Sequence, residues 1–198
     1  MIKPTDWEEV QEYGAYVPLE KGGHKCYVVK VEEMKSSTGK AMLKIAIDTA
    51  EDDVQPKFFR EAFNNDSRQD KKWPAGGIVY QLLEDNEGHT NRGFKTFIAA
   101  LEKSNPGFVA PWGDKFCDGL KNLRIGGIFG REEYIGHNDG KAHWSTKCVQ
   151  FRPVEDIENG NFTTPEDKPL SESAEAPIPT TAPSGGYYSI DSEDDIPF

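Results

Sequence analysis

Cysteine is scarce in this chain of 198 residues, and Cys26, Cys117 and Cys148 are widely spaced. An odd number at such spacing argues against a disulfide framework and suits a reducing cytosol. No apolar run approaches the length of a membrane span. Residues 1–11 are polar and acidic, so we expect no signal peptide. These absences predict a cytoplasmic protein.

Short catalytic and metal-binding motifs are missing as well. The chain has no Gly-x-x-x-x-Gly-Lys loop, no Gly-x-Ser-x-Gly elbow and no Cys-x-x-Cys pair. Two loose sets lack the spacing of structural zinc sites: His24 with Cys26, and His137 with His143 and Cys148. We therefore predict no metal, no cofactor and no enzymatic activity.

Basic residues are almost absent from the last part of the chain. Residues 153–198 hold eleven acidic residues and one base, Lys168, so most of the net charge of −11 lies there. The first 152 residues are nearly neutral and can still carry a basic face. Residues 153–189 are rich in Pro, Ser and Glu and poor in large apolar residues, which predicts a disordered linker. A flexible chain of that length reaches roughly 35 Å.

The first 152 residues read as short strands with one helix. Alternating apolar and polar residues or turn signals predict strands over 26–31, 43–49, 77–83, 123–134 and 144–151. Helical spacing predicts a helix over 93–104, ended by Asn-Pro-Gly. Gly126-Gly127 suggests a bulge, and 50–76 forms a long insertion. Three strands, a helix and two strands is the order of an OB-fold, a five-stranded barrel that binds oligonucleotides.

The chain ends on a distinctive acidic and apolar segment. Residues 190–198 read Ile-Asp-Ser-Glu-Asp-Asp-Ile-Pro-Phe. A basic pocket with an apolar slot could capture such an end. The segment resembles the acidic tip of bacterial single-stranded DNA-binding proteins, which recruits replication, recombination and repair enzymes. The resemblance implies a protein-interaction role for Asp191, Glu193, Asp194, Asp195, Ile196, Pro197 and Phe198. A tail that only improves solubility is the simpler alternative.

The remainder of the chain has a resemblance of its own. It is carried by 14–18 (Gly-Ala-Tyr-Val-Pro), 27–31 (Tyr-Val-Val-Lys-Val), 39–45 (Gly-Lys-Ala-Met-Leu-Lys-Ile), 93–95 and 102–108. These segments are similar to small phage proteins regarded as OB-fold single-stranded DNA binders. The opening strand pattern of the cellular bacterial proteins is absent, which puts their tetrameric assembly in doubt here and leaves a homodimer open.

Binding of single strands without sequence preference needs cations along the phosphates and aromatic rings that stack on bases. Several stretches combine the two, and each ring has the core of the fold as an equally good alternative. The candidate DNA-binding residues are Lys30, Lys40, Lys44, Lys57, Phe58, Phe59, Arg60, Lys72, Trp73, Arg131, Tyr134, Trp144 and Lys147.

Together these features predict an OB-fold single-stranded DNA-binding domain over 1–152, a disordered linker over 153–189 and an acidic protein-interaction tip over 190–198. The expected function is to coat and protect single strands during phage DNA replication, recombination or repair in the bacterial cytoplasm. The main alternative is an OB-fold adaptor that binds proteins and little or no DNA. A metal-dependent nuclease ranks third, on the carboxylates Asp48, Glu51, Asp52 and Asp53.

Overall fold

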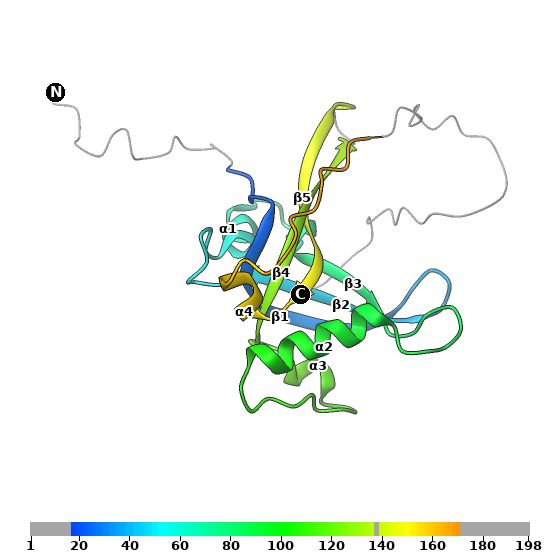
Figure 1. Ribbon diagram of the computed structural model, residues 1–198. Coiled ribbons are helices and arrows are strands. Elements are labelled where there is room, and N and C mark those ends of the chain that lie inside the picture. Colours follow the sequence, from blue (N-terminus) through cyan, green and yellow to red (C-terminus); the bar gives the residue numbers. More distant parts are fainter. Residues whose placement is uncertain (1–16, 137–138, 171–198) are drawn as a thin grey trace, which may run out of the picture.

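A computed structural model describes residues 17–136 and 139–170 (Figure 1). The chain is mainly β, with five antiparallel strands and a few helices. The strands are β1 (Gly22–Lys35), β2 (Ala41–Thr49), β3 (Ile78–Leu82), β4 (Arg124–Ile135) and β5 (Ala142–Arg152). The helices are α1 (Phe58–Asn65), α2 (Arg92–Ser104), α3 (Phe116–Gly119) and α4 (Val154–Glu158), with a 3-10 turn over Ala75–Gly77.

The strands form one open sheet in the order β3-β2-β1-β4-β5. The five predicted strands and the helix between the third and the fourth are confirmed, but the prediction of a single helix is wrong, because α1 lies between β2 and β3, α3 precedes β4 and α4 follows β5. The predicted turn over 36–40 is also confirmed: the Ser36 N–H donates to the Lys40 carbonyl at 2.8 Å, and Gly39 has φ 80°. That φ value lies in the left-handed region, which glycine adopts without a steric penalty.

The core lies between one face of the sheet and α2, which crosses the lower end of the sheet in Figure 1. Leu43, Ile45 and Ile47 alternate along β2 and are fully buried. Phe97 of α2 packs on Phe151 of β5, with ring centroids 4.9 Å apart. The helix begins where the Asn91 side chain accepts a hydrogen bond from the Gly93 N–H, so a good N-cap fixes its start.

The 50–76 insertion is packed against the body and contains α1. The Asp48 carboxylate accepts the N–H groups of Phe59 and Arg60, which caps the first turn of the helix. The ring of Phe59 is buried and stacks on Phe129 at 6.0 Å. At the end of the insertion, Trp73 is buried and donates its indole N–H to the Ile47 carbonyl at 3.1 Å.

The bulge predicted at Gly126-Gly127 is displaced along the strand. The register of β4 against β5 shifts between Ile128 and Phe129. Both glycines instead permit close packing, because a Cβ at Gly127 would lie 2.8 Å from the Phe129 ring. A Cβ at Gly126 would lie 2.5 Å from the Ile157 side chain. The pair is therefore a packing requirement of the core rather than a bulge.

The disordered linker predicted from residue 153 is wrong for residues 153–170. Residues 154–158 form α4, and the segment 159–170, which we name the strap, runs along β4 (Figure 1). The Phe162 ring packs over Gly23, leaving no room for a Cβ there. The Lys168 N–H donates to the Arg131 carbonyl, and the Glu133 N–H donates to the Lys168 carbonyl, both at 2.9 Å. Residues 171–189 and the predicted tip at 190–198 lie outside the described residues.

The strap occupies an edge of β4 that no other strand reaches. β1 pairs with β4 only as far as Gly22 opposite Phe129. Beyond that point the strap continues the hydrogen bonding with a parallel bridge between Glu132 and Lys168. None of the helices among the described residues is long and apolar enough to cross a membrane.

Candidate nucleic-acid interface

One face of β1, β2 and β3, opposite the face of Leu43, Ile45 and Ile47, carries rings and cations; its β2 residues are buried, and its β1 and β3 residues are mostly half-buried or exposed. We name it the outer sheet face. Lys44 of β2 lies opposite Glu32 of β1 and Tyr80 of β3. Residues directly opposite one another in antiparallel strands share a face. The same register places these residues on it: Tyr27, Lys30, Met34, Met42, Lys44 and Tyr80.

A bulge in β1 puts Tyr27 and Lys30 on the same face. Strand residues three positions apart normally point to opposite sides. Here the register shifts between Val28 and Lys30, so that Tyr27 lies opposite Asp48 and Lys30 opposite Ala46. The extra residue therefore adds a cation to the face that carries the tyrosine.

The charges at the centre of the face are two cations and one carboxylate. Lys30 Nζ lies 2.7 Å from Glu32 Oε1. Lys44 is 9 % exposed, and burial lowers the pKa of its ammonium, which the Glu32 charge partly offsets. The three groups leave a surplus of positive charge, which suits an anion such as a phosphate.

Arg60 and Tyr27 close one end of the outer sheet face. The Arg60 guanidinium lies 5.7 Å from the centroid of the Tyr27 ring, and its Nε is 3.5 Å from Asp48 Oδ2. The Tyr27 hydroxyl donates to the same Asp48 oxygen at 3.0 Å. Burial and the nearby carboxylate raise the pKa of Tyr27 to about 12, so its hydroxyl remains a donor at neutral pH.

The β4–β5 hairpin extends beyond Phe129 and Cys148 as a two-stranded arm, residues 130–136 and 139–147 (Figure 1). On one side of the arm, the Arg131 guanidinium lies 5.1 Å from the centroid of the Trp144 ring. Asp167 of the strap pairs with Arg131 and with Lys21, each at 2.8 Å. A cavity of about 520 Å³ borders Arg131 and Trp144.

The other side of the arm carries a second ring and cation. Tyr134 is 45 % exposed, and its ring centroid lies 5.8 Å from that of His143. Lys147 pairs with Glu132 at 3.4 Å. Lys147 on this side and Tyr80 on the outer sheet face border the same gap between β3 and β5.

A groove of about 470 Å³ occupies that gap, which we name the seam groove. Within the described residues β3 pairs with β2 and β5 with β4, and the two strands do not pair with each other. The groove is lined by side chains from both edges and from the strap, including Tyr80, Lys147, Val149, Pro165 and Lys168. It joins the outer sheet face, at Tyr80, to the side of the arm that carries Lys147 as one continuous surface.

Two predicted DNA-binding rings belong to the core instead. Phe59 is 2 % exposed and Trp73 is 7 % exposed, so neither ring can stack on a base. Phe58 is half-buried and packs edge-on against Phe59 at 5.2 Å. Neighbouring cations in the sequence suggested stacking, but the contacts with Phe129 and the Ile47 carbonyl hold the rings inside.

The predicted cations divide into two groups. Lys30, Lys44 and Arg60 lie on the outer sheet face, and Arg131 and Lys147 on the arm with Tyr134 and Trp144. Lys40 contacts the Asp85 carbonyl at 3.1 Å and Asn86 Oδ1 at 2.5 Å, and Lys57 pairs with Glu51 at 2.8 Å. Lys72 lies in the insertion and is half-buried. Lys40, Lys57 and Lys72 are therefore separate from the continuous surface.

Tyr27, Tyr80 and Lys168 were missed by sequence reasoning. Tyr80 is 39 % exposed and lies in a predicted strand, so its alternation was visible. The side of the sheet on which Tyr80 lies depends on the pairing of β3 with β2. That pairing cannot be read from the sequence. Lys168 was assigned to a linker.

The acidic run after β2 does not converge on one point. Asp48 caps α1, Glu51 pairs with Lys57, and Asp52 pairs with Arg124 at 2.8 Å. Asp53 Oδ1 lies 2.8 Å from Nδ1 of the buried His24. Over residues 17–136 and 139–170, no group of three or more His, Cys, Asp or Glu side chains is placed to hold a metal ion. His137 lies outside that part of the chain.

No model of a known protein family matches the sequence. No curated protein matches it either.

Proposed function

We propose that this chain is a single-stranded DNA-binding protein with an OB-fold body. The strand order β3-β2-β1-β4-β5, with α2 between β3 and β4, fits an OB barrel whose seam lies between β3 and β5. In that fold the face around strands 2 and 3 and the loops between strands 1–2 and 4–5 bind oligonucleotides. The outer sheet face corresponds to that strand face and the arm to the loop between strands 4 and 5, whereas the loop between strands 1 and 2, at 36–40, lies outside both.

The observation that carries the proposal is the set of exposed rings and cations on the continuous surface and, with Trp144 and Arg131, on the opposite side of the arm. Tyr80, Tyr134 and Trp144 are each 39–45 % exposed, which leaves ring faces open to bases. Stacking of one base on one ring contributes about 1–3 kcal/mol without sequence preference. Lys30, Lys44, Arg131 and Lys147 lie beside these rings and would follow the phosphates.

Carboxylates already neutralise most of these cations in the free protein. Glu32, Glu132 and Asp167 each lie within 3.4 Å of a cation on this surface. A bound strand would exchange those carboxylates for phosphates, which makes binding moderate in strength and sensitive to salt. The same pairing favours the second candidate, an OB-fold adaptor that contacts proteins and binds DNA weakly.

The proposed cellular role follows from two resemblances, that of the body to phage single-stranded DNA binders and that of the tip at 190–198 to the acidic tip of bacterial single-stranded DNA-binding proteins. The body would coat single strands during phage DNA replication, recombination or repair in the bacterial cytoplasm. The tip at 190–198 would recruit the enzymes of those processes through Phe198 and its carboxylates.

The deciding experiment is fluorescence anisotropy of a labelled oligo-dT beside a duplex of equal length, at two salt concentrations. Binding of the single strand alone, weakened by salt, is the expected result. If the full chain and a chain ended at residue 170 both leave oligo-dT free at low salt, the DNA-binding proposal is wrong and the adaptor is the better account.

A further inference from the structure

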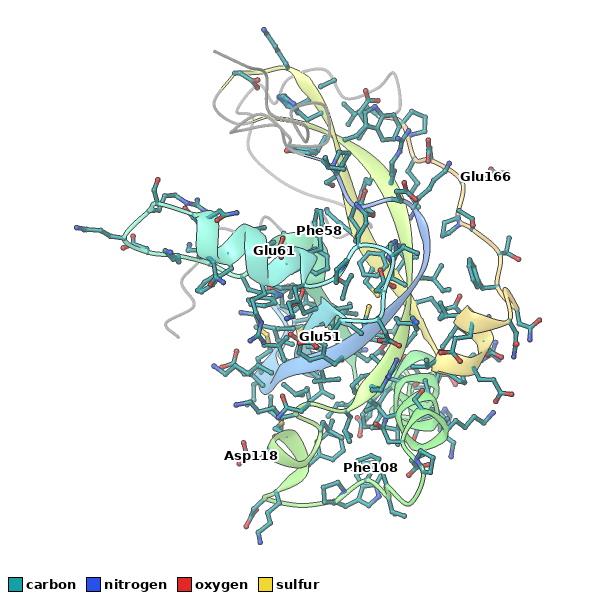
Figure 2. All side chains as sticks on the ribbon, turned by 90° about the vertical axis from the view of Figure 1, so that its left-hand side faces the viewer. Glu51, Phe58, Glu61, Phe108, Asp118 and Glu166 are labelled. Atoms are coloured by element: carbon teal, nitrogen blue, oxygen red, sulfur yellow. The ribbon has the colours of Figure 1, made fainter. Side chains whose placement is uncertain are left out.

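The end of the molecule opposite the arm contains a groove that adjoins the outer sheet face at Glu32. Figure 2 shows Phe108 and Asp118 at this end, below the sheet, with the arm at the other end. The groove has a volume of about 660 Å³ and lies between α3, the start of α2 and the ends of β1 and β2. We name it the aromatic groove, lined by Leu83, Phe94, Trp112 and Phe116 with Glu32, Glu33 and Asp114.

Three rings form one wall of the aromatic groove. Trp112 is 67 % exposed and stacks on Phe116, with centroids 5.2 Å apart and planes 18° apart. The Phe94 ring lies edge-on to both, at 6.2 Å from each. Phe116 is buried in the core, so the stack holds the exposed indole in a fixed place.

The charge along this groove has the sign opposite to that of a phosphate-binding surface. Its lining includes three carboxylates and no cation. Glu33 and Asp114 form no ion pair within the described residues, and Glu32 is shared with Lys30. Exposed rings beside uncompensated carboxylates attract a cationic side chain and repel a nucleic-acid backbone.

We propose that the aromatic groove binds a basic peptide segment of a partner protein. An Arg or Lys side chain of that segment would lie over the Trp112 ring and pair with Glu33 and Asp114. A neighbouring apolar side chain would pack against Phe94 and Leu83. Because the groove and the arm lie at opposite ends, a partner could bind while the arm holds a strand.

The test uses the full chain and a labelled short peptide in which Leu alternates with Arg. The control peptide carries Gln in place of each Arg. We expect the Arg peptide to bind and the Gln peptide to bind about tenfold more weakly or not at all. Trp112→Ala should weaken binding of the Arg peptide about tenfold. Glu33→Gln with Asp114→Asn should weaken it similarly and reduce its salt dependence.

A matched variant tests whether loss of an exposed tryptophan elsewhere also affects binding of the peptide. Trp144→Ala removes an exposed tryptophan at the other end and should leave peptide binding unchanged. Equal binding of the Arg peptide to the wild-type protein and to Trp112→Ala would overturn the proposal, since acidic residues elsewhere would then hold the peptide. A loss of oligo-dT binding in Trp112→Ala would also overturn the proposal, because the aromatic groove would then be part of the DNA-binding surface.

Binding of the peptide can be tested even if one variant is unstable or if the protein does not bind DNA. Thermal unfolding of Trp112→Ala checks the fold, and the two charge substitutions are at surface carboxylates. If oligo-dT fails to bind the wild-type protein while the Arg peptide binds and responds to Trp112→Ala, the groove proposal holds and the DNA proposal fails.

Discussion

The guanidinium of Arg131 lies over the indole ring of Trp144, with 5.1 Å between the guanidinium carbon and the ring centroid. The two residues come from neighbouring strands of the arm, where Trp144 lies opposite Glu133 and Arg131 opposite Thr146. Such a pair offers a flat cationic surface on which a base can stack while the charge remains near its phosphate.

Trp144→Ala should weaken binding of oligo-dT by about 1–3 kcal/mol, the usual loss for one stacking ring. The ring is 43 % exposed, so the free energy of unfolding should change little. Anisotropy titrations measure the first quantity and urea denaturation the second. An affinity for oligo-dT equal to that of the wild-type protein would remove the arm from the interface.

Glu132→Gln should strengthen binding of oligo-dT by about twofold to fivefold, because it removes a carboxylate that pairs with Lys147 and repels phosphate. The gain should shrink as salt is added. Glu158→Gln on α4 is the matched control, since it removes one negative charge away from the arm. An equal gain in both variants would mean that only net charge matters.

A chain ended at residue 152 should be less stable than one ended at residue 170 by about 3–6 kcal/mol. The shorter chain loses Val154, which is buried, and the side chains of Ile157 and Phe162 over Gly126 and Gly23. A fully buried side chain of this kind contributes about 1.5–3 kcal/mol. Urea denaturation of the two chains measures the difference in the free energy of unfolding. Equal midpoints would mean that residues 153–170 do not stabilise the folded domain.

Stability should fall as pH rises above 6.5, the usual pKa of histidine, because of His24. Both ring nitrogens face acceptors, Asp53 Oδ1 at 2.8 Å and the Glu20 carbonyl at 3.0 Å, so only the protonated ring can donate to both. Burial, the largest single effect, lowers the pKa of His24, but the hydrogen bonds and charges of Asp53 and Glu20 together raise it by more, so that it ends above the usual value of 6.5.

The direction of the pH effect on stability follows from the linkage between protonation of His24 and folding. A raised pKa in the folded state gives stability that is complete below pH 6.5 and is lost as pH rises through the folded-state value. Urea denaturation across pH 5.5 to 8.5, an interval of about 1–2 units on either side of the usual histidine value, measures it. His24→Gln should be less stable at the acid end and should show a flatter profile. A wild-type profile as flat as that of the variant would contradict this role.

Deletion of residues 191–198 should leave the affinity for oligo-dT equal or higher, since it removes four acidic side chains that would compete with phosphates for the cations of the proposed interface. Binding to enzymes of replication and repair should be lost. Phe198→Ala keeps the charge of the tip and should also abolish binding to the enzymes. This variant therefore distinguishes recognition of the terminal ring from attraction by the acidic side chains. Much weaker DNA binding by the deleted chain would contradict the proposed division of roles.

Local patterns in the sequence predicted the strands and α2 because those patterns are set by local periodicity. The 43–49 alternation lies within β2, and the predicted helix over 93–104 differs from α2 by one residue at its start. α1 was not predicted, because its N-terminus is capped by Asp48 from another element. β1 begins earlier than predicted, at Gly22, because its pairing with β4 extends it through a glycine-rich stretch.

The candidate site was less predictable because it depends on register and burial. The bulge at Val28 and Lys30 decides which residues share the outer sheet face, and no local signal marks it. Trp73 follows two lysines, yet a hydrogen bond to the Ile47 carbonyl holds it in the core. The strap has the composition of a linker, and long-range ion pairs from Asp167 to Lys21 and Arg131 hold it on the body.

The strap also has a consequence for self-association. An uncovered strand edge offers its N–H and C=O groups to any other chain, and such edges promote aggregation and domain swapping. The strap occupies these groups on Arg131 and Glu133. A proteolytic cut near α4 would expose them on the arm, where two molecules could pair edge to edge. The segment that leads to the acidic tail therefore also protects the body from polymerising through its own sheet.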